Sequence, residues 1–206
     1  MSATDVIERS EPVCADAHLC SLDRVVMPHG GYRTIVADPP WRYDGRLPVT
    51  GNAPGRTRQH GSSGTDYPTM SIKEIAEMPV TRLRNTDGSH LYLWTTNTHL
   101  EHAWNIARKW GFEPKQLLTW CKKPKGMIGF GAYSPCTEFC LFAACGARAA
   151  HIGRSERTWW EWPRTTKHSQ KPAGFFDIIE AVSPTPRLEM FARARRLGWD
   201  AWGNEA

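Results

Sequence analysis

The 206-residue sequence lacks a stretch that could enter or cross a membrane. No apolar run approaches the roughly 20 residues of a transmembrane helix. The first residues include Asp5, Glu8, Glu11 and Asp16, where a secretory signal needs an apolar segment. We therefore expect a cytoplasmic protein with no membrane partner.

The sequence is also poor in the patterns of metal sites. Its six cysteines contain no C-x-x-C pair, and no pair of histidines completes a zinc pattern. Cys121, Cys140 and Cys145 lie in or beside apolar runs, as small core residues do. The sequence predicts reduced thiols and no metal.

What the sequence does contain is typical of one soluble domain, with 40% hydrophobic and 23% charged residues. We expect residues 29–206 to form a single domain and residues 1–28 a flexible tail. The formal net charge of +5 fits a polyanionic partner without proving one, since many basic proteins bind no nucleic acid. Ten tryptophans offer flat surfaces on which bases can stack, besides filling the core.

Apolar runs and helix signals alternate along the chain. Strands are predicted at Tyr32–Ala37, Ser89–Thr95, Gln116–Cys121, Glu138–Ala144, Arg187–Phe191 and Trp199–Trp202. Helices are predicted after the capping box at Ser71, from Leu100 to a cap at Gly111, and after Pro172. This alternation predicts an α/β domain with a largely parallel sheet flanked by helices.

The first predicted strand ends in Asp38-Pro39-Pro40-Trp41, the position at which α/β sheets bind their ligands. An aromatic amine is a poor nucleophile because its lone pair is delocalised into the ring. A carboxylate from Asp38 and the carbonyl of Pro39, each accepting one N–H, would free that lone pair and stabilise the growing positive charge. Pro40 keeps the turn rigid, and Trp41 can stack on the base. The alternative is a rigid turn without function.

Two basic segments are candidate nucleic-acid surfaces. The loop over residues 42–66 is rich in Gly, Ser and Thr, and its Arg46, Arg56 and Arg58 can each offer a fork to phosphate oxygens. A second segment interleaves arginines with Trp159, Trp160 and Trp162. The alternatives are a solvated loop for the first segment and packing against the sheet for the second.

Further motifs extend over about residues 30–205. They are Ala37–Trp41, Tyr67–Met70, Leu91–Asn97, Trp110–Phe112, Trp120–Lys122, His168–Pro172, Leu188–Arg193 and Gly198–Glu205. In this order they resemble the family of the seventy-kilodalton catalytic subunit of mRNA adenosine-N6 methyltransferase, and more closely its prokaryotic and phage members.

The resemblance implies a Rossmann-like methyltransferase that uses S-adenosylmethionine and has its catalytic motif before its main cofactor segment. It thereby accounts for the absence of G-x-G-x-x-G after the first strand. By position, Lys171 would pair with the methionyl carboxylate of the cofactor, Arg193 would contact the ribose, and Asp38 would lie near the amino group. The other implied cofactor residues are His168, Asn204 and Glu205. The implied residues of the acceptor pocket are Tyr67 and Glu138, and Asn97 at the end of a strand is a further candidate.

We therefore predict an enzyme that transfers a methyl group directly to the N6 amine of adenine in nucleic acid, with DNA favoured over RNA. Three alternatives stay open: an RNA methyltransferase, a catalytically silent nucleic-acid-binding subunit, and an enzyme for free adenine nucleotides or nucleosides. A homodimer is compatible with the sequence.

Overall fold

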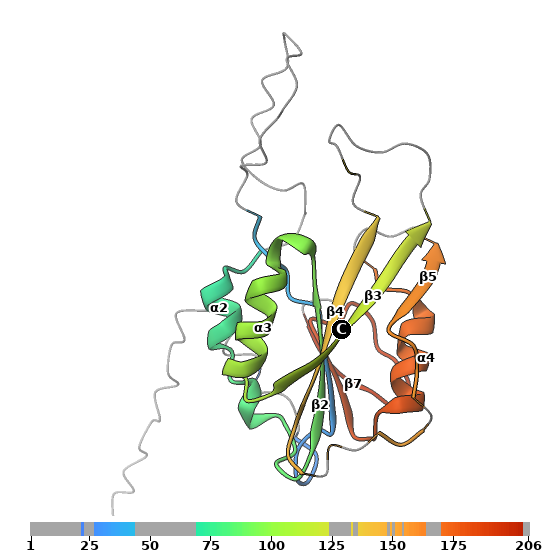
Figure 1. The fold of residues 1–206 in the computed structure, drawn as a ribbon. Helices are drawn as coiled ribbons and strands as arrows, with labels where there is room; N and C mark the ends of the chain where they lie inside the picture. Colours follow the sequence, from blue (N-terminus) through green and yellow to red (C-terminus); the bar gives the residue numbers. More distant parts are fainter. Residues whose placement is uncertain are drawn as a thin grey trace, which may run out of the picture.

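The computed structural model describes residues 22, 27–43, 69–123, 133, 136–147, 149, 151–153, 155–163 and 170–203. A single seven-stranded sheet has α2 and α3 on one face and α4 on the other (Figure 1). The strands are β1 Thr34–Ala37, β2 Ser89–Thr95, β3 Glu113–Lys123, β4 Thr137–Cys145, β5 Trp159–Pro163, β6 Arg187–Met190 and β7 Asp200–Trp202. The helices are α2 Ile72–Glu77, α3 Leu100–Lys109 and α4 Ala173–Val182, with short 3-10 helices η2 Val80–Arg82 and η3 Asn97–His99.

The strand order is β5-β3-β4-β2-β1-β6-β7, and only β4 runs against its neighbours. The predicted α/β class with a largely parallel sheet is therefore confirmed. Where the parallel strands end, β4 begins, and we call this the carboxyl edge of the sheet. The opposite edge, where β3 begins and β4 ends, is the amino edge.

Both faces of the sheet are buried, as expected for strands that pair in parallel beneath helices. Alternate residues of β2 divide between them: Leu91 and Leu93 pack towards α2 and α3, whereas Tyr92 and Trp94 pack towards α4. Trp110 and Trp120 are buried, one in each core.

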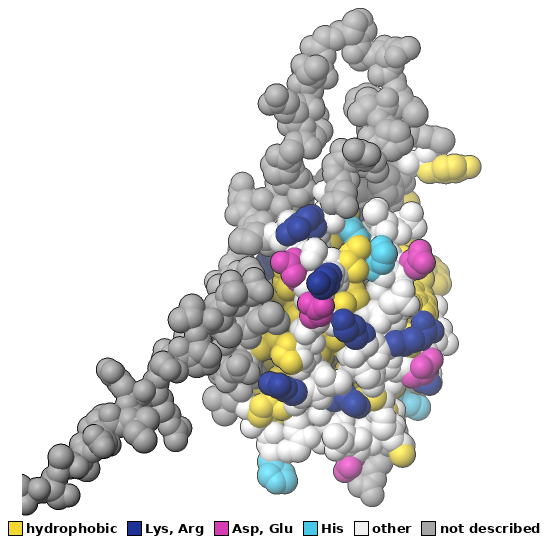
Figure 2. Space-filling view, turned by 90° about the vertical axis from the view of Figure 1, so that its left-hand side faces the viewer, with side chains coloured by type: hydrophobic (Ala, Val, Ile, Leu, Met, Phe, Trp, Pro, Cys, Tyr) yellow, Lys and Arg dark blue, Asp and Glu magenta, His cyan; other side chains and the backbone are white. Residues whose placement is uncertain are grey.

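Local signals set the ends of the helices. The capping box that opens α2 is present, because the Ser71 hydroxyl accepts from the Glu74 amide and the Glu74 carboxylate accepts from the Ser71 amide. Gly111 follows α3 with φ +79°, a left-handed conformation that suits glycine at a helix end. Charged side chains of both signs are interspersed on the face that α2 and α3 cover (Figure 2).

The structure departs from the predicted elements in several places, among them later starts for β1, at Thr34, and for β7, at Asp200. Strand β5 was not predicted; it pairs with β3, and the rings of Trp160 and Trp162 stack on each other 5.7 Å apart. Trp162 packs against the core beside α4, which favours the packing alternative for that residue, while Trp159 stays 54% exposed. Strand β6 ends at Met190, one residue earlier than predicted, because Phe191 adopts φ +62°. Strand β3 is longer than the predicted Gln116–Cys121.

The N-terminal region is described only at Leu22 and from Met27 onward, so the flexible tail over residues 1–28 stays a prediction. Leu22 itself is buried in the core beside α2 and α3. Among the residues that the structure describes, no helix has the length and apolar character needed to span a membrane.

Candidate active site

A chain of alternating charges crosses the carboxyl edge. Asp38 follows β1, Lys171 precedes α4, and Glu138 is the second residue of β4. The Lys171 ammonium lies 2.7 Å from Oδ2 of Asp38 and 3.4 Å from Oε2 of Glu138. The other oxygen of Glu138 accepts a hydrogen bond from Lys122 at the end of β3. We call Asp38, Lys171, Glu138 and Lys122 the charge chain.

Topology explains why these residues meet. Asp38 and Lys122 lie at or near strand ends, whereas Glu138 lies at a strand start. They share one edge because β4 runs antiparallel between β2 and β3. Reversing β4 would carry Glu138 to the far edge of the sheet, so the antiparallel strand is what supplies the second carboxylate.

Burial and pairing work against each other in the charge chain. Burial lowers the pKa of Lys171, but the carboxylates of Asp38 and Glu138 outweigh this and raise the pKa above its ordinary value. Burial raises the pKa of Glu138, but Lys171 and Lys122 outweigh it and leave that pKa lowered. For Asp38, burial prevails and raises the pKa, with Lys171 acting in the opposite direction. Lys171 is thus held charged between two acids.

The turn over Asp38–Trp41 is fixed by backbone hydrogen bonds. The Trp41 amide donates to the Pro39 carbonyl at 2.8 Å, and the Met70 amide donates to the Pro40 carbonyl at 2.8 Å. A carbonyl oxygen has two lone pairs, so that of Pro39 retains capacity for one more donor. This capacity is what the predicted contact with a substrate amine needs.

Trp41 is held in place beneath this turn. Its indole N–H donates to the Trp94 carbonyl at 3.1 Å, and its ring stacks on His99 with the ring centres 5.0 Å apart. His99 in turn donates through Nε2 to the Arg42 carbonyl at 3.1 Å. With 6% of Trp41 exposed, the role that the structure shows for it is to anchor the turn. Base stacking by Trp41 stays a prediction.

A cavity of about 290 Å³ opens beside the charge chain. Its walls include Asp38, Lys171, Glu189 and Arg193, together with apolar side chains such as Phe176. Burial raises the pKa of Glu189 to about 7; repulsion from Asp38 adds to this, and Arg196 acts against it. The cavity thus joins two carboxyl groups and four cations, the other two being Arg195 and Arg196, over an apolar wall, a set that matches a zwitterionic ligand with hydroxyl groups.

Several predicted site residues cannot be placed. Those outside the described residues are Arg46, Arg56, Arg58, Tyr67, His168, Asn204 and Glu205. Asn97 is described: it begins η3 beyond β2, is exposed, and does not line the cavity. The catalytic and binding roles of all these residues stay predictions.

Three residues of this region were not assigned an individual role from the sequence. They are Lys122, which holds Glu138, His99, which supports Trp41, and Glu189 in the cavity wall. A signal for Glu189 existed, because it lies within Leu188–Arg193, one of the motifs that carry the family resemblance. In the described part of the chain, no group of three His, Cys, Asp or Glu side chains is placed to hold a metal ion.

The model of the MT-A70 family matches residues 32–205, which is most of the described chain and includes the whole charge chain. The chain belongs to the MT-A70 family. The predicted resemblance is therefore confirmed, and with it a Rossmann-like methyltransferase fold. Methyltransferases generally take their methyl group from S-adenosylmethionine.

Curated relatives come from bacteria and eukaryotes. A protein of Mycoplasma named type II methyltransferase M.MunI is 31% identical over 190 residues, covering 87% of this chain and 79% of its own. A probable N(6)-adenosine-methyltransferase MT-A70-like protein of Oryza sativa is 27% identical, covering 85% of this chain. The human N(6)-adenosine-methyltransferase catalytic subunit METTL3 is 24% identical over 99% of this chain. The chain spans only 23% of the rice relative and 32% of the human one.

Proposed function

We propose that this MT-A70 methyltransferase transfers a methyl group from S-adenosylmethionine to the N6 amine of adenine in DNA. The observation that carries the proposal is the position of Asp38. Its carboxyl group lies at the carboxyl edge, is fixed by Lys171 at 2.7 Å, and lines the cavity beside the charge chain. A nucleobase amine presented there would meet an oriented acceptor in a protected site.

The residues at this edge supply what an adenine amine lacks. Asp38 accepts one N–H of the amine and the Pro39 carbonyl accepts the other, so the lone pair points away from the ring and the positive charge that develops is stabilised. Neither group needs to remove a proton before attack. Glu138, kept ionised by Lys122 and Lys171, adds negative charge on the same side.

The donor set of the cavity fits the cofactor. Lys171 would hold the methionyl carboxylate, Arg193 would contact the ribose, and Asp38 would lie near the amino group. Glu189 adds an acceptor for hydroxyl groups and a negative charge that suits a sulfonium. When bound, S-adenosylmethionine supplies an electrophilic methyl group. His168, Asn204 and Glu205 complete the proposed set.

Two observations favour DNA over RNA. The identity to the type II methyltransferase of Mycoplasma is 31%, against 27% and 24% to the rice and human proteins named for adenosine. The alignment also covers 79% of the Mycoplasma relative, so the two chains are similar in length.

A target adenine in a duplex must leave the stack, at a cost of a few kcal/mol, so single-stranded or distorted DNA should react faster.

The test is a methylation assay with labelled S-adenosylmethionine and three acceptors: DNA and RNA oligonucleotides of identical sequence, and free adenine nucleotides. We expect label in N6-methyladenine from DNA. Higher initial rates on RNA at equal salt would overturn the choice of polymer and leave the adenine chemistry standing. Label on another base, or none on any acceptor although the protein binds the cofactor, would overturn the function itself.

The loop arginines give a second measurement of the same proposal. Replacing Arg46, Arg56 and Arg58 by Gln should weaken DNA binding with little sequence preference and flatten its dependence on salt. Equal salt slopes for the wild type and this variant would remove the loop from the binding surface. A homodimeric assembly stays a prediction.

A further inference from the structure

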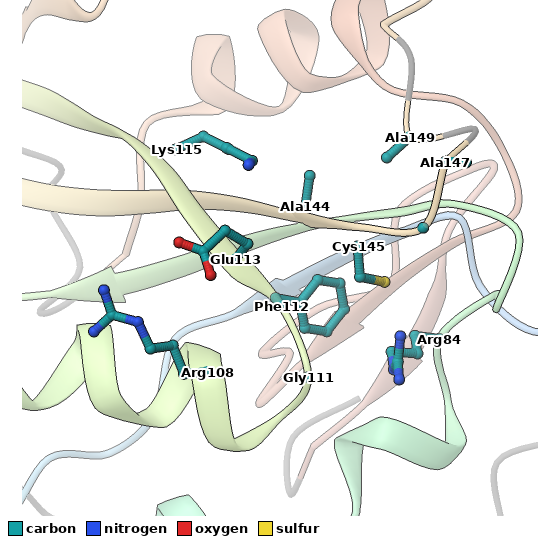
Figure 3. A pocket seen from close by; sticks show the side chains of 11 residues that line it. Arg84, Arg108, Gly111, Phe112, Glu113, Lys115, Ala144, Cys145, Ala147 and Ala149 are labelled. Carbon is teal, nitrogen blue, oxygen red and sulfur yellow. The ribbon is translucent and has the colours of Figure 1, made fainter.

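A hollow of about 790 Å³ lies at the amino edge, at the opposite end of β3 and β4 from the charge chain (Figure 3). Its walls come from the end of α3, the start of β3, the end of β4 and the residues that follow η2. The lining residues that matter here are Arg84, Arg108, Gly111, Phe112, Glu113 and Lys115. We call this hollow the amino-edge pocket.

The amino-edge pocket has an excess of positive charge. Arg84, Arg108 and Lys115 face a single carboxylate, that of Glu113. Arg108 and Lys115 lie at one end with Glu113 between them, and Arg84 lies at the other end, beyond Phe112 (Figure 3). Within the described part of the chain, none of these four charged side chains makes a hydrogen bond or an ion pair.

Arg84 is packed on its neighbours although it lacks an anionic partner among the described residues. Its guanidinium lies 5.9 Å from the centre of the Phe112 ring. It also packs against Gly111, where an added Cβ would come within 3.1 Å of Arg84 Nη2. Its Nε is buried and has no hydrogen-bond partner. A buried donor left unsatisfied is costly, and the fold bears this cost while it keeps the Arg84 guanidinium at the wall of the pocket.

Lys115 reaches the pocket from an irregularity in β3. The register with β4 shifts between Pro114 and Gln116, so Lys115 is the extra residue of a β-bulge. Bulges turn a side chain away from the direction that strict alternation would give it. Packing at Arg84 and a bulge at Lys115 thus direct two cations from separate elements to one hollow.

We propose that the amino-edge pocket binds phosphate groups. An arginine offers a planar fork that matches phosphate oxygens, and a lysine adds a point charge. An excess of two positive charges suits either two neighbouring phosphodiesters of a nucleic acid strand or one phosphate or pyrophosphate group of a small molecule. Glu113 can accept from a sugar hydroxyl beside the phosphate in either case.

Nucleic acid is within reach of both edges. From Glu138 to Ala144, β4 advances six residues, roughly 20 Å. This corresponds to about six base pairs of B-DNA. A strand whose adenine lies at Asp38 could therefore place its flanking phosphates near the amino-edge pocket. Nucleic acid as the source of these phosphates rests on the proposed function. Free phosphate ligands do not depend on it.

The test compares two double variants of equal charge. Arg108→Gln with Lys115→Gln removes two exposed cations of the pocket, and Arg82→Gln with Lys109→Gln removes two exposed cations outside it. Binding to a labelled DNA oligonucleotide is measured by fluorescence anisotropy over a series of salt concentrations. Binding of inorganic pyrophosphate is measured by calorimetry without DNA. Neither measurement involves turnover, so a failure of the methylation assay leaves them interpretable.

We expect the pocket variant to lose about tenfold in DNA affinity and its salt slope to fall by about 1.4 to 1.8, with little change in the control variant. Loss of pyrophosphate binding in the pocket variant, with DNA binding unchanged, would instead assign the pocket to a free phosphate ligand. Arg84→Lys keeps the positive charge but lacks the planar fork of arginine. It should lose binding only in part, in whichever of the two measurements the pocket variant loses it. The proposal is overturned if the pocket variant and the control variant behave alike in both arms.

Discussion

The two edges of the sheet use charge in opposite ways. At the carboxyl edge, Asp38, Lys171, Glu138 and Lys122 alternate in sign, and each is paired with its neighbour. At the amino edge, Arg84, Arg108 and Lys115 surround a hollow with a single carboxylate, and no side chain of the described residues pairs with them. Every member of the charge chain is paired with another, whereas the amino-edge pocket has a surplus of unpaired positive charge.

The difference separates two kinds of functional site. A paired cation is oriented by the protein, so it can hold a reacting group in a fixed direction, as Lys171 holds Asp38. An unpaired cation is available to bind an anion that arrives from outside. The pairs of the charge chain therefore orient groups for chemistry, whereas the amino-edge cations are left for recognition, and each assignment makes a different prediction for mutation.

The largest effect should come from removing the shared cation of the charge chain. The Lys171 side chain, which bridges Asp38 and Glu138, is only 10% exposed. Lys171→Met removes this cation and leaves the two acids without their shared partner. Breaking one partner of a buried ion pair costs roughly 3 kcal/mol or more in the free energy of unfolding. Urea denaturation measures this loss. Lys115→Met at the amino edge is the matched variant, and it should change stability by less than about 0.5 kcal/mol.

An equal loss for the two lysines would abolish the comparison, because it would mean that Lys115 is paired in solution. No loss for Lys171→Met would show that the two acids relax apart or protonate at little cost.

The next effect concerns chemistry at the same edge. Asp38→Ala removes the acceptor that orients the amine, and the loss of one such group typically lowers the rate on the order of a hundredfold or more. Single-turnover methylation of a DNA oligonucleotide measures it, with circular dichroism to confirm folding. Glu77→Gln, an exposed carboxyl change on α2, is the control and should keep the wild-type rate. A rate within a few fold of wild type for Asp38→Ala would remove Asp38 from the reaction.

A third effect distinguishes two carboxyl groups of the carboxyl edge. The pKa of Glu138 is lowered by its lysines, whereas that of Glu189 is raised to about 7, chiefly by burial. A raised pKa means that the native state binds more protons than the unfolded state between about pH 4.5 and 7. The contribution of Glu189 to the free energy of unfolding is therefore fully present below the pKa that this residue has in the unfolded chain. It is lost as the pH rises through the folded-state pKa of about 7.

Glu189→Gln mimics the protonated acid and should remove this loss. At pH 8 the variant should be more stable than wild type by on the order of 2 kcal/mol, and at pH 4.5 the two should nearly coincide. Thermal unfolding at both pH values measures the difference, with Glu101→Gln as an exposed control. A constant difference at all pH values would show that Glu189 titrates normally.

Most of the fold could be predicted because its signals are local. Strand β2 has the predicted bounds, the Ser71 capping box opens α2, and Gly111 ends α3. Strand β5 was missed because its alternating tryptophans also fit a base-stacking surface, and only pairing with β3 decides between the two. Long-range contact, and not propensity, made it a strand.

The site was predictable where one motif contains it and unpredictable where strands must assemble it. Asp38 and the turn after it are contiguous, so the sequence reveals them. Glu138 was named through resemblance, but its meeting with Lys122 depends on β4 running antiparallel to β3, which no local pattern records. Glu189 joins the cavity because β6 pairs beside β1, across about 150 residues of intervening chain.

The smallest effect should come from the helix that steadies the turn at the carboxyl edge. Met70 forms a β-bridge with Trp41, in which its carbonyl accepts from the Arg42 amide and its amide donates to the Pro40 carbonyl. The next residue, Ser71, is the N-cap of α2. Ser71→Ala removes the side-chain acceptor of the capping box and should lower the free energy of unfolding by about 1 kcal/mol. Thermal denaturation measures the global loss.

Hydrogen exchange then tests whether that loss is local to one edge. If the capping box mainly holds the turn over Asp38–Trp41, the Met70 amide should exchange about fivefold faster in Ser71→Ala, because opening there becomes easier by about 1 kcal/mol. The Phe112 amide, which donates to the Ala107 carbonyl at the amino edge, should keep its rate. Equal acceleration of both amides would mean that the edges open together, and the carboxyl edge would then owe its order to the whole domain rather than to α2.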